Sequence, residues 1–399
     1  MNSDAKKILS MASKYRDFTA DLLGQLVRIP SPSGGEEKVC RAVAAMCREI
    51  GFDEVRIDGF GSVVARIGTG PRKLAIDAHI DTVGVGDASQ WDRDPYSGLI
   101  ENGLVHGRGS ADQKGGAAAM LAAGRILKDI GYQDQYSIYF TFTVLEEDCD
   151  GLCWRYLIEK EALKPELAVS TEPTSCRLYR GQRGRMEIEV KVRGISAHGS
   201  APERGESAAY KAARAALAVE KLNKDLPSDD FLGKATVTVS RIEAHGPSLC
   251  AVPDQGSVYI DRRLTWGENA TDALLQVRAC MGADAESVLM PYFDRKGWKE
   301  TDFGQELYFP AWMISADHLL VRKGREAHKS LFSTEPEIGK WTFSTNCVAI
   351  CGIHGIPCIG FGPGDEQQAH APNEFTRIDD LEKCAAFYAM LPIVLSKEA

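Results

Sequence analysis

The amino-acid sequence predicts an α/β protein of 399 residues whose larger domain is split by a smaller, inserted α+β domain. Strand and helix patterns alternate over residues 1–181, which is typical of a sheet with helices packed on its faces. Over residues 182–295 the strand patterns alternate polar and apolar side chains, as in antiparallel strands with one exposed face. The first pattern returns over residues 296–399. We therefore expect the first and third ranges to form one domain and the middle range to form the insert.

The first range contains the elements of an α/β sheet. Residues up to 29 predict an amphipathic helix that ends before Pro30. Apolar runs predict strands at residues 62–67 and 73–79, and the β-rich run 136–145 predicts a third. Between them, residues 115–131 carry Ala, Leu and Met at helical spacing and predict a helix.

The insert has its own order of elements. Residues 185–193 alternate strictly between polar and apolar side chains, which indicates a half-exposed antiparallel strand. A helix, two strands, a helix and a last strand follow, at residues 207–223, 234–242, 256–264, 270–281 and 287–293. This β-α-β-β-α-β order predicts a small open-faced, ferredoxin-like sandwich. In the third range, residues 348–353 and 357–361 predict short buried segments.

Charge and composition exclude several classes of function. Lys and Arg number 47 and Asp and Glu 56, so the net charge is −9, and no basic block is present that could bind a phosphate backbone. No apolar run approaches the length that spans a bilayer, and the N-terminus has no signal-peptide core. We expect neither a nucleic acid nor a membrane as a partner.

Eleven cysteines follow no disulfide-scaffold pattern. Their spacing also lacks the CxxC motif of a zinc knuckle or a redox dithiol. An odd number of cysteines without an export signal is typical of reduced, mostly buried thiols in the cytoplasm. We therefore expect a cytoplasmic protein.

The first candidate for chemistry is the pair His79 and Asp81, at the end of a predicted strand. Residues i and i+2 of a strand project to the same side, and open α/β sheets place their sites at the carboxyl ends of strands. His79 can bind a metal ion through one ring nitrogen, and Asp81 can orient the ring. Alone, such a pair is more often structural.

The second candidate is Asp112, which lies in the glycine-rich stretch 107–116. Glycines on both sides let the backbone fold tightly around the carboxylate at the start of a helix, where it could bridge two cations. A helix N-cap is an equally good interpretation of this motif alone.

Further carboxylates follow other predicted strands. Glu146 and Glu147 come directly after the run 136–145, so one can bind a metal ion while the other acts as general base with a pKa raised by neighbouring acids. For this pair alone, a solvated acidic turn is the better interpretation. Glu172 and His370 would complete the ligand shells. Two histidines with these carboxylates suit two zinc-like ions, which make water nucleophilic at neutral pH.

Taken together, the motifs HIDTV, GRGSADQKGG, EED, STEP and AHAPNE resemble the di-zinc amidohydrolase and exopeptidase family, peptidase family M20. This family includes acetylornithine deacetylase, succinyl-diaminopimelate desuccinylase, aminoacylase and carboxypeptidase G. The resemblance covers nearly the whole chain. The later segments CAVPD, IDRRLTWGE, FSTN and GIPCIGFGPG look most like the branch of selenium-metabolism-linked hydrolases.

The resemblance implies a mixed-sheet, three-layer, zinc-exopeptidase-like catalytic domain with an inserted lid and dimerisation domain. It implies two Zn²⁺ per chain, with Co²⁺ or Mn²⁺ as ions that also fit such ligands. One ion would be held by His79 and Glu172, and the other by Glu147 and His370, with Asp112 between them. It makes Glu146 the base, and Asp81 the support of His79.

The resemblance also assigns residues of the insert. His198 is similar to the lid histidine that reaches the partner subunit's site and stabilises the oxyanion, although it could be an ordinary turn histidine. Arg263 aligns with an arginine that pairs with a substrate carboxylate, and Arg262 is its neighbouring rival. Cys250 stands where many members have Asn, either as a substrate contact or as a buried packing residue. Asn346 in the segment FSTN is a further candidate for substrate binding.

We therefore expect a homodimeric metal-dependent hydrolase that cleaves the amide bond of a small N-acyl amino acid or a dipeptide-like substrate. A dipeptidase, a carboxypeptidase and a ureido-acid amidohydrolase could use the same site. Two functions of other classes are alternatives: a catalytically silent, metal-binding regulator, and a redox role for the cysteines.

Overall fold

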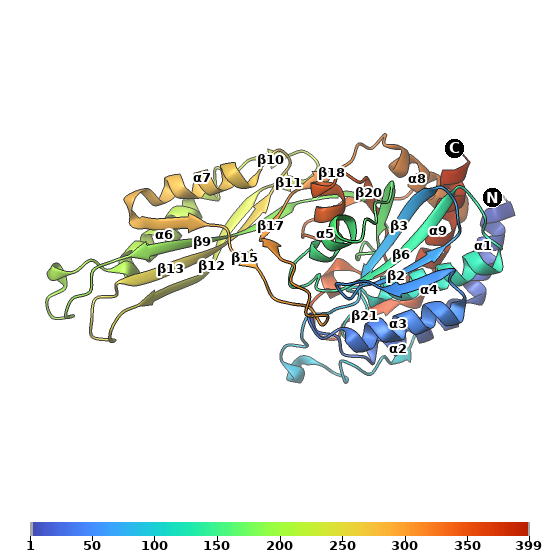
Figure 1. The fold of residues 1–399 in the computed structure, drawn as a ribbon, viewed down its shortest axis with the longest axis horizontal. Helices are drawn as coiled ribbons and strands as arrows, with labels where there is room; N and C mark the ends of the chain where they lie inside the picture. The colour runs from blue at the N-terminus through green and yellow to red at the C-terminus, as the bar shows by residue number, and fades with distance from the viewer. Residues whose placement is uncertain (1–2, 398–399) are drawn as a thin grey trace.

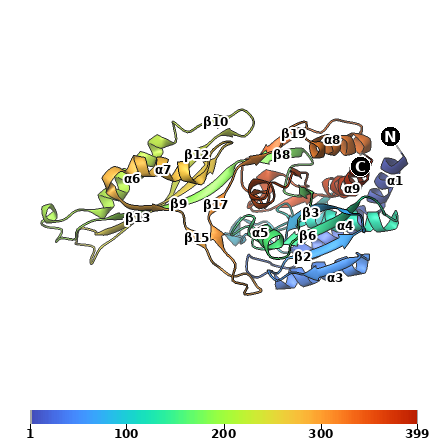
Figure 2. The same ribbon diagram turned by 45° about the horizontal axis from the view of Figure 1, so that its top comes forward.

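The computed structural model describes residues 3–397, which form an elongated molecule of two bodies (Figure 1). The larger body holds a mixed sheet covered by helices, with the first and last described residues, 3 and 397, at its outer end. The smaller body projects from the opposite end (Figures 1 and 2). Each body has its own hydrophobic cluster.

The large sheet has nine strands in the order β1-β2-β6-β3-β7-β20-β8-β18, with β19 also paired to β8. The central strands β6, β3, β7 and β20 are parallel to one another. The strands are β1 Glu54–Ile57, β2 Val63–Ile67, β3 Arg72–His79, β6 Tyr136–Thr143, β7 Leu167–Ser170, β8 Leu178–Gln182, β18 Trp312–Met313, β19 Ile338–Trp341 and β20 Cys358–Gly360. The three strands predicted at 62–67, 73–79 and 136–145 are confirmed.

Helices lie on both faces of this sheet. On one face α4 packs on α2, α3 and α9, and α8 and α1 pack on α9. On the other face, α5 packs on a π-helical turn, and the Asn346 side chain next to that turn reaches Asp77 of β3. The helices are α1 Ser3–Lys14, α2 Arg16–Val27, α3 Glu37–Ile50, α4 Lys114–Asp129, α5 Leu152–Glu159, α8 Leu319–Phe332 and α9 Ile378–Ser396. The expected three-layer α/β architecture is confirmed.

Two sequence predictions for this body are wrong in detail. The N-terminal segment forms two helices, α1 and α2, which are separated at Tyr15 and both pack on α9. The run Val348–Ile353, predicted to be a short buried segment, forms the π-helical turn beside α5; Val348, Ala349 and Ile350 are buried, but Ile353 is 44% exposed.

The first turn of α4 contacts the end of β7 closely because glycine occupies position 116. A Cβ added at Gly116 would lie 2.1 Å from Oγ1 of Thr171, directly after β7. This contact fixes the start of α4, and with it the glycine-rich stretch before it, against the carboxyl ends of the central strands.

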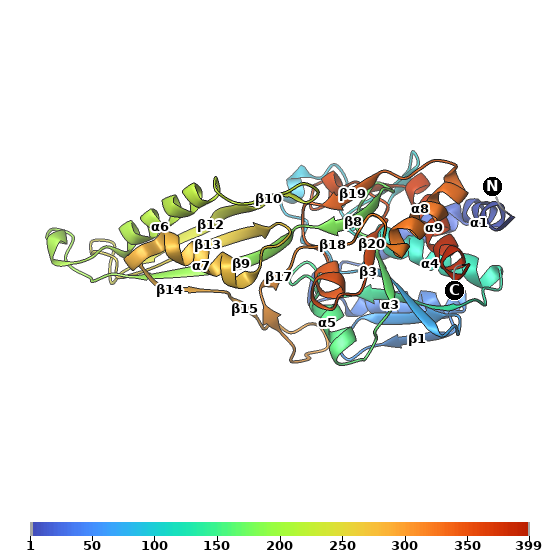
Figure 3. The ribbon, with the colours of Figure 1, turned by 90° about the horizontal axis from the view of Figure 1, so that it is seen from above.

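The smaller body is the predicted insert. Its sheet has the antiparallel order β12-β13-β9-β14, and α6 and α7 pack against it (Figure 3). The elements are β9 Gly184–Arg193, α6 Ala208–Leu222, β12 Thr236–His245, β13 Gln255–Leu264, α7 Ala270–Met281 and β14 Ala285–Leu289. The β-α-β-β-α-β order and the ferredoxin-like sheet are confirmed.

The last strand of the insert is shorter than predicted. β14 ends at Leu289, and β15 (Tyr292–Phe293) pairs with β16 (Gln305–Glu306) outside the insert's sheet. The sheet instead gains β17 (Tyr308–Phe309), which pairs with β9. The domain boundaries at residues 181/182 and 295/296 therefore stay predictions, since a strand from beyond residue 295 joins the insert's sheet.

The remaining elements are short. A three-stranded sheet has the order β21-β5-β4, with β4 Ile100–Glu101, β5 Leu104–His106 and β21 Phe375–Arg377. A hairpin in the insert joins β10 (Ser228–Asp229) and β11 (Gly233–Lys234). Short 3₁₀ turns are at Ala88–Gln90, Pro202–Arg204, Gly282–Asp284 and Glu366–Gln368. Within residues 3–397, no helix is long and apolar enough to cross a membrane.

Candidate metal centre and active site

The candidate site forms where parallel strands end side by side. β3 ends at His79, β6 ends shortly before Glu146 and Glu147, and β7 ends shortly before Glu172. Since β6, β3 and β7 are adjacent and parallel, these side chains meet at one edge of the sheet. The segment that follows β20 brings His370 to the same edge.

Asp112 lies between the two histidines, with one carboxylate oxygen directed at each. His79 Nε2 is 3.0 Å from Asp112 Oδ1, and His370 Nε2 is 3.5 Å from Asp112 Oδ2. Glu172 lies 3.8 Å from His79 Nε2, and Glu147 lies 2.9 Å from His370 Nε2. The structure thus forms two groups of donors that share Asp112, and within each group the donor atoms lie within 4.8 Å of one another.

The helix N-cap interpretation of Asp112 is wrong. α4 begins at Lys114, its N-cap residue is Gln113, and no side chain caps the helix. The Asp112 carboxylate instead faces the histidines, and only 8% of the residue is exposed.

The structure corrects how Asp81 supports His79. The nearer partner of His79 Nδ1 is the main-chain oxygen of Asp81 at 3.0 Å, while the nearest carboxylate oxygen lies 3.6 Å away. The Asp81 carboxylate accepts hydrogen bonds from the main-chain N–H groups of Glu146 and Glu147 and from the Ser33 hydroxyl. Asp81 therefore holds His79 through its backbone and the Glu146–Glu147 turn through its side chain, because that turn otherwise lacks partners for its N–H groups.

Glu146 is buried, so the interpretation as a solvated acidic turn is wrong. Burial, together with the carboxylates of Asp150, Glu172 and Glu147, raises the pKa of Glu146 well above its usual value, although His79 opposes this. The closest approach of its carboxylate to His79 Nε2 is 3.8 Å. Glu146 thus lies beside the two donor groups without belonging to either.

The carboxylates of the site lie close together, and burial largely excludes solvent from them. Burial and the neighbouring Asp112 raise the pKa of both Glu147 and Glu172. Burial also disfavours ionisation of Asp112, but the hydrogen bond from His79 and the charges of His79, His370 and Arg108 together outweigh it and lower the pKa of the Asp112 carboxyl. Four buried acids around two histidines form a set of nitrogen and oxygen donors that suits divalent zinc-like cations. The residues present therefore fit a metal centre.

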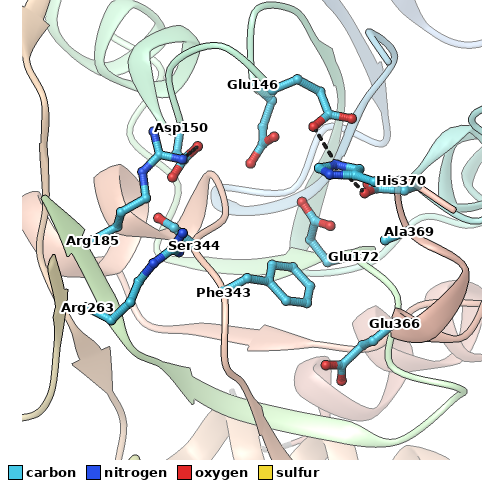
Figure 4. Close-up of a pocket in the computed structure, with 12 residues that line it drawn as sticks. Glu146, Asp150, Glu172, Arg185, Arg263, Phe343, Ser344, Glu366, Ala369 and His370 are labelled. Carbon is cyan, nitrogen blue, oxygen red and sulfur yellow. Dashed lines mark hydrogen bonds and ion pairs between the residues drawn. The ribbon is translucent and has the colours of Figure 1, made fainter. Parts of the chain in front are cut away.

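A pocket of about 350 Å³ adjoins the donor groups and extends towards the smaller body. Figure 4 shows Arg185 and Arg263 across the pocket from His370. Arg263 was predicted from its motif, whereas the other lining residues were not, namely Asp150, Arg185, Phe343, Ser344, Glu366 and Ala369.

Arg263 and Arg185 are cross-strand neighbours on β13 and β9. Arg263 forms a two-point ion pair with Asp261, and Arg185 bonds Glu187 and lies 3.9 Å from Asp150. The alternating pattern of 185–193 placed Arg185 on a polar face. Only the pairing of β9 with β13 shows that this face is the one that carries Arg263.

Arg262, the alternative to Arg263, does not line the pocket, so its assignment as the substrate-binding arginine is wrong. Its side chain is fully buried and bonds Glu268 and Gln276. Successive strand residues point to opposite faces, so Arg262 enters the insert's interior while Arg263 faces the pocket.

Asn346 is also not a pocket residue. It is 1% exposed, donates to Asp77 Oδ2 and Thr143 Oγ1, and accepts from the Gly151 main-chain N–H. Its amide joins β3, β6 and the start of α5 beneath the site. The prediction of substrate binding by Asn346 is replaced by a role in holding these elements together.

The loop between β9 and α6, which carries His198, and the loop between β12 and β13, which carries Cys250, lie at the end of the insert that is remote from the large sheet, and His198 pairs there with Ala251 (Figure 1). His198 and Cys250 are both exposed, and Cys250 O accepts a hydrogen bond from the N–H of Gly199. Neither lines the pocket of its own chain. The alternative of Cys250 as a buried packing residue is wrong. Site roles for both residues stay predictions that require a partner chain.

Comparison with known proteins gives the relationship of this chain. The model of peptidase family M20/M25/M40 matches residues 75–392, which include all the donor residues. The chain belongs to this family. As a member it is a metal-dependent peptidase or amidohydrolase, and the expected resemblance is confirmed.

Individual relatives support this assignment. The uncharacterized protein YgeY of Escherichia coli K12 is 49% identical over 394 residues, which are 98% of each chain. A succinyl-diaminopimelate desuccinylase of Magnetococcus marinus is 28% identical over 246 residues, covering 58% of this M20 chain and 63% of the relative.

Solved structures share the fold. A tripeptidase from Staphylococcus aureus has a TM-score of 0.75 at 21% identity, covering 95% of this chain and 98% of its own. Human carnosine dipeptidase 1 has a TM-score of 0.74 at 15% identity, covering 99% of each chain. At these identities the likeness describes the fold of the M20 chain alone.

Proposed function

We propose that this M20 chain hydrolyses the amide bond of a small N-acyl amino acid or dipeptide-like substrate with the help of two Zn²⁺ ions. His79 and Glu172 would hold one ion, Glu147 and His370 the other, and Asp112 both. The observation that carries this proposal is the position of Asp112, whose two carboxylate oxygens each face a different histidine beside the pocket. Co²⁺ and Mn²⁺ also suit these mixed donors.

Two such ions, when bound, polarise a carbonyl and make water nucleophilic at neutral pH. Glu146 then has the properties of the general base, because it lines the pocket, stands outside both donor groups and has a raised pKa. In the proposed reaction its carboxylate takes a proton from the attacking water and later gives it to the leaving amine. Its buried position keeps bulk water away from this transfer.

Arg263 and Arg185 support a substrate whose leaving half carries a carboxylate. Their guanidinium groups lie across the pocket from His370, and a guanidinium binds a carboxylate through two parallel hydrogen bonds. A pocket of about 350 Å³ suits a substrate of one or two amino-acid units. The substrates of deacylases, dipeptidases, carboxypeptidases and ureido-acid hydrolases all have this size and a carboxylate on the leaving half.

The oxyanion in the proposed reaction is stabilised by His198 of a second chain, so that the active protein is a homodimer formed through the insert. The exposure of His198 supports this, since its loop between β9 and α6 lies at the remote end of the insert and the residue does not line its own chain's pocket. We also propose a cytoplasmic location. It rests on the cysteines of residues 3–397, which are all free and mostly buried.

The alternative of another class is a catalytically silent regulator that binds metal. It is disfavoured because Glu146, which neither donor group needs, is nevertheless buried at the pocket.

The test is the release of amine, followed by mass spectrometry, from N-acyl amino acids, dipeptides and ureido acids. Zinc-loaded protein is compared with Glu146→Ala, and with Glu166→Ala as a control, since Glu166 pairs with Arg72 at the surface. We expect Glu146→Ala to lower kcat about 100- to 10,000-fold with its zinc content unchanged, and Glu166→Ala to act like the wild type.

Each other outcome contradicts a part of the proposal. Full turnover by Glu146→Ala would show that Glu146 is not the general base. A wild-type protein that binds no zinc would show that the donor groups are not a zinc site. Two bound ions without turnover across the whole panel favour the silent regulator.

A further inference from the structure

One buried carboxylate of the site region has no part in the proposed reaction. Glu374 is 0% exposed and lies four residues after His370, in a segment that crosses the glycine-rich stretch carrying Asp112. It is not a member of either donor group and does not line the 350 Å³ pocket. A buried carboxylate is unfavourable unless its oxygens are fully hydrogen-bonded.

Both oxygens of Glu374 accept hydrogen bonds from the stretch 107–116. Oε1 accepts from the N–H of Ala111 at 2.7 Å and from the N–H of Asp112 at 3.0 Å. Oε2 accepts from the N–H of Gly109 at 3.0 Å and from Nη1 of Arg108 at 2.6 Å. The carboxylate therefore fixes the backbone of Asp112 itself, and with it the origin of the side chain that faces both histidines.

The same carboxylate reaches His370 through Arg108. The second amino group of Arg108 donates to the main-chain oxygen of His370 at 3.3 Å, and its guanidinium lies over the ring of Trp91. His370 has a positive φ of 61°, which residues other than glycine rarely adopt. The hydrogen bond from Arg108 to its main-chain oxygen helps to hold this backbone conformation.

Further contacts join the two segments around Glu374. Its own main-chain oxygen accepts from the N–H of Gly107, and the Thr376 hydroxyl donates to Ser110 O. Phe375 pairs with His106 where β21 joins β5. The segments are thus held in one register, and Glu374 is the residue that links Asp112 and His370 by charge-assisted hydrogen bonds.

We infer that Glu374 is a positioning residue of the metal centre, which sets the separation of Asp112 and His370 and so the affinity for the ion that they share. This inference rests on the proposed function. Residues that hold metal ligands in place commonly change metal affinity by about 10- to 100-fold when they are replaced. A purely structural role would change the stability of the fold and leave zinc affinity unchanged.

Asp58 offers a matched control elsewhere in the chain. It is 3% exposed, and its Oδ1 accepts from the N–H groups of Phe60, Gly61 and Ser62. None of these residues belongs to the donor groups or lines the pocket. Asp58→Asn therefore disturbs a comparable carboxylate-bound turn without touching a predicted ligand.

The experiment measures zinc affinity by competition with a chromophoric chelator, and thermal stability of the metal-free protein, for wild type, Glu374→Gln and Asp58→Asn. An amide at position 374 presents an NH₂ group to donors that need an acceptor. We expect Glu374→Gln to bind one of its two zinc ions about 10- to 100-fold less tightly than the wild type does. Asp58→Asn should lose stability but keep wild-type zinc affinity.

Glu374→Asp serves if the amide variant does not fold. It keeps the charge beside Arg108 but is too short to reach all four donors, and it should show an intermediate loss of zinc affinity. Wild-type affinity in a folded Glu374 variant overturns the inference. Absence of zinc binding by the wild type instead overturns the proposed function, so the two failures are distinguishable.

Discussion

Arg262 and Arg263 are adjacent in the chain, yet one bonds buried partners inside the insert and the other faces the pocket. The alternation of strand side chains explains this separation. A substitution at Arg263 therefore tests binding in the pocket, and the same substitution at Arg262 is its control.

We predict that Arg263→Met raises KM for substrates with a carboxylate on the leaving half. Loss of a charge-assisted hydrogen bond is worth about 1.5–3 kcal/mol, which is roughly a 10- to 150-fold fall in kcat/KM. The measurement is steady-state kinetics on a carboxylate substrate and on its amide analogue. An equal loss with both would show that Arg263 does not bind the carboxylate. Arg262→Met should mainly lower thermal stability.

Asn346 is the residue for which structure and sequence disagree most. We predict that Asn346→Ala lowers the free energy of unfolding by about 1–3 kcal/mol, because buried partners on β3 and β6 lose their hydrogen bonds. KM should be unchanged. Urea unfolding and steady-state kinetics check this, with Asn223→Ala, which removes one bond to Val237 in the insert, as control. A raised KM with normal stability would restore the original assignment.

At the scale of elements, the end of α4 is tied to the sheet by Asp53. Its carboxylate accepts from Lys128 Nζ at 2.5 Å, and from the N–H of Gly68 at 2.7 Å. Burial disfavours its ionisation, but these partners and the charge of Arg66 together outweigh burial and lower the pKa of Asp53 below its usual value. The folded state therefore binds this proton less tightly than the unfolded state.

A pKa lowered by folding gives stability that is present above the unfolded pKa and is lost as the pH falls through the folded one. We predict that Asp53→Asn is less stable than wild type by about 0.5–1 kcal/mol at neutral pH, the range of a partly exposed ion pair. The difference should shrink below about pH 4. Urea unfolding at several pH values tests this, beside the exposed Asp17→Asn. A difference that stays constant or grows in acid would contradict the assignment.

At the scale of the whole molecule, the loop between β9 and α6 lies at the far end of the elongated molecule, and His198 in this loop does not line the pocket of its own chain. We predict that His198→Ala and Glu146→Ala are each nearly inactive, and that co-refolded mixtures regain activity. In a mixed dimer, one site has both an intact Glu146 and an intact His198 from the other chain. Random pairing gives about a quarter of the wild-type activity. Mixtures that stay inactive would show that His198 does not act across a dimer.

Much of the fold was predictable because hydrophobic periodicity is a local property. The runs at β2, β3 and β6 and the strict alternation of β9 identified the central sheet and the insert. The predictions failed where a long-range contact decides the conformation. The run 348–353 was predicted to be buried throughout, but only the first half of its π-helical turn packs into the core, and Ile353 is exposed.

The sequence by itself determined the α/β class, the inserted domain and the identity of the chemical groups, because motif spacing and strand ends restrict where ligand-type side chains can lie. Only the tertiary structure decided which of them face one another. Asp112 is shared by two histidines, Arg185 joins Arg263, and Asn346 is turned away from the pocket. These relations depend on strand order and on the crossing of distant segments such as 107–116 and 370–377, which no local pattern of residues encodes.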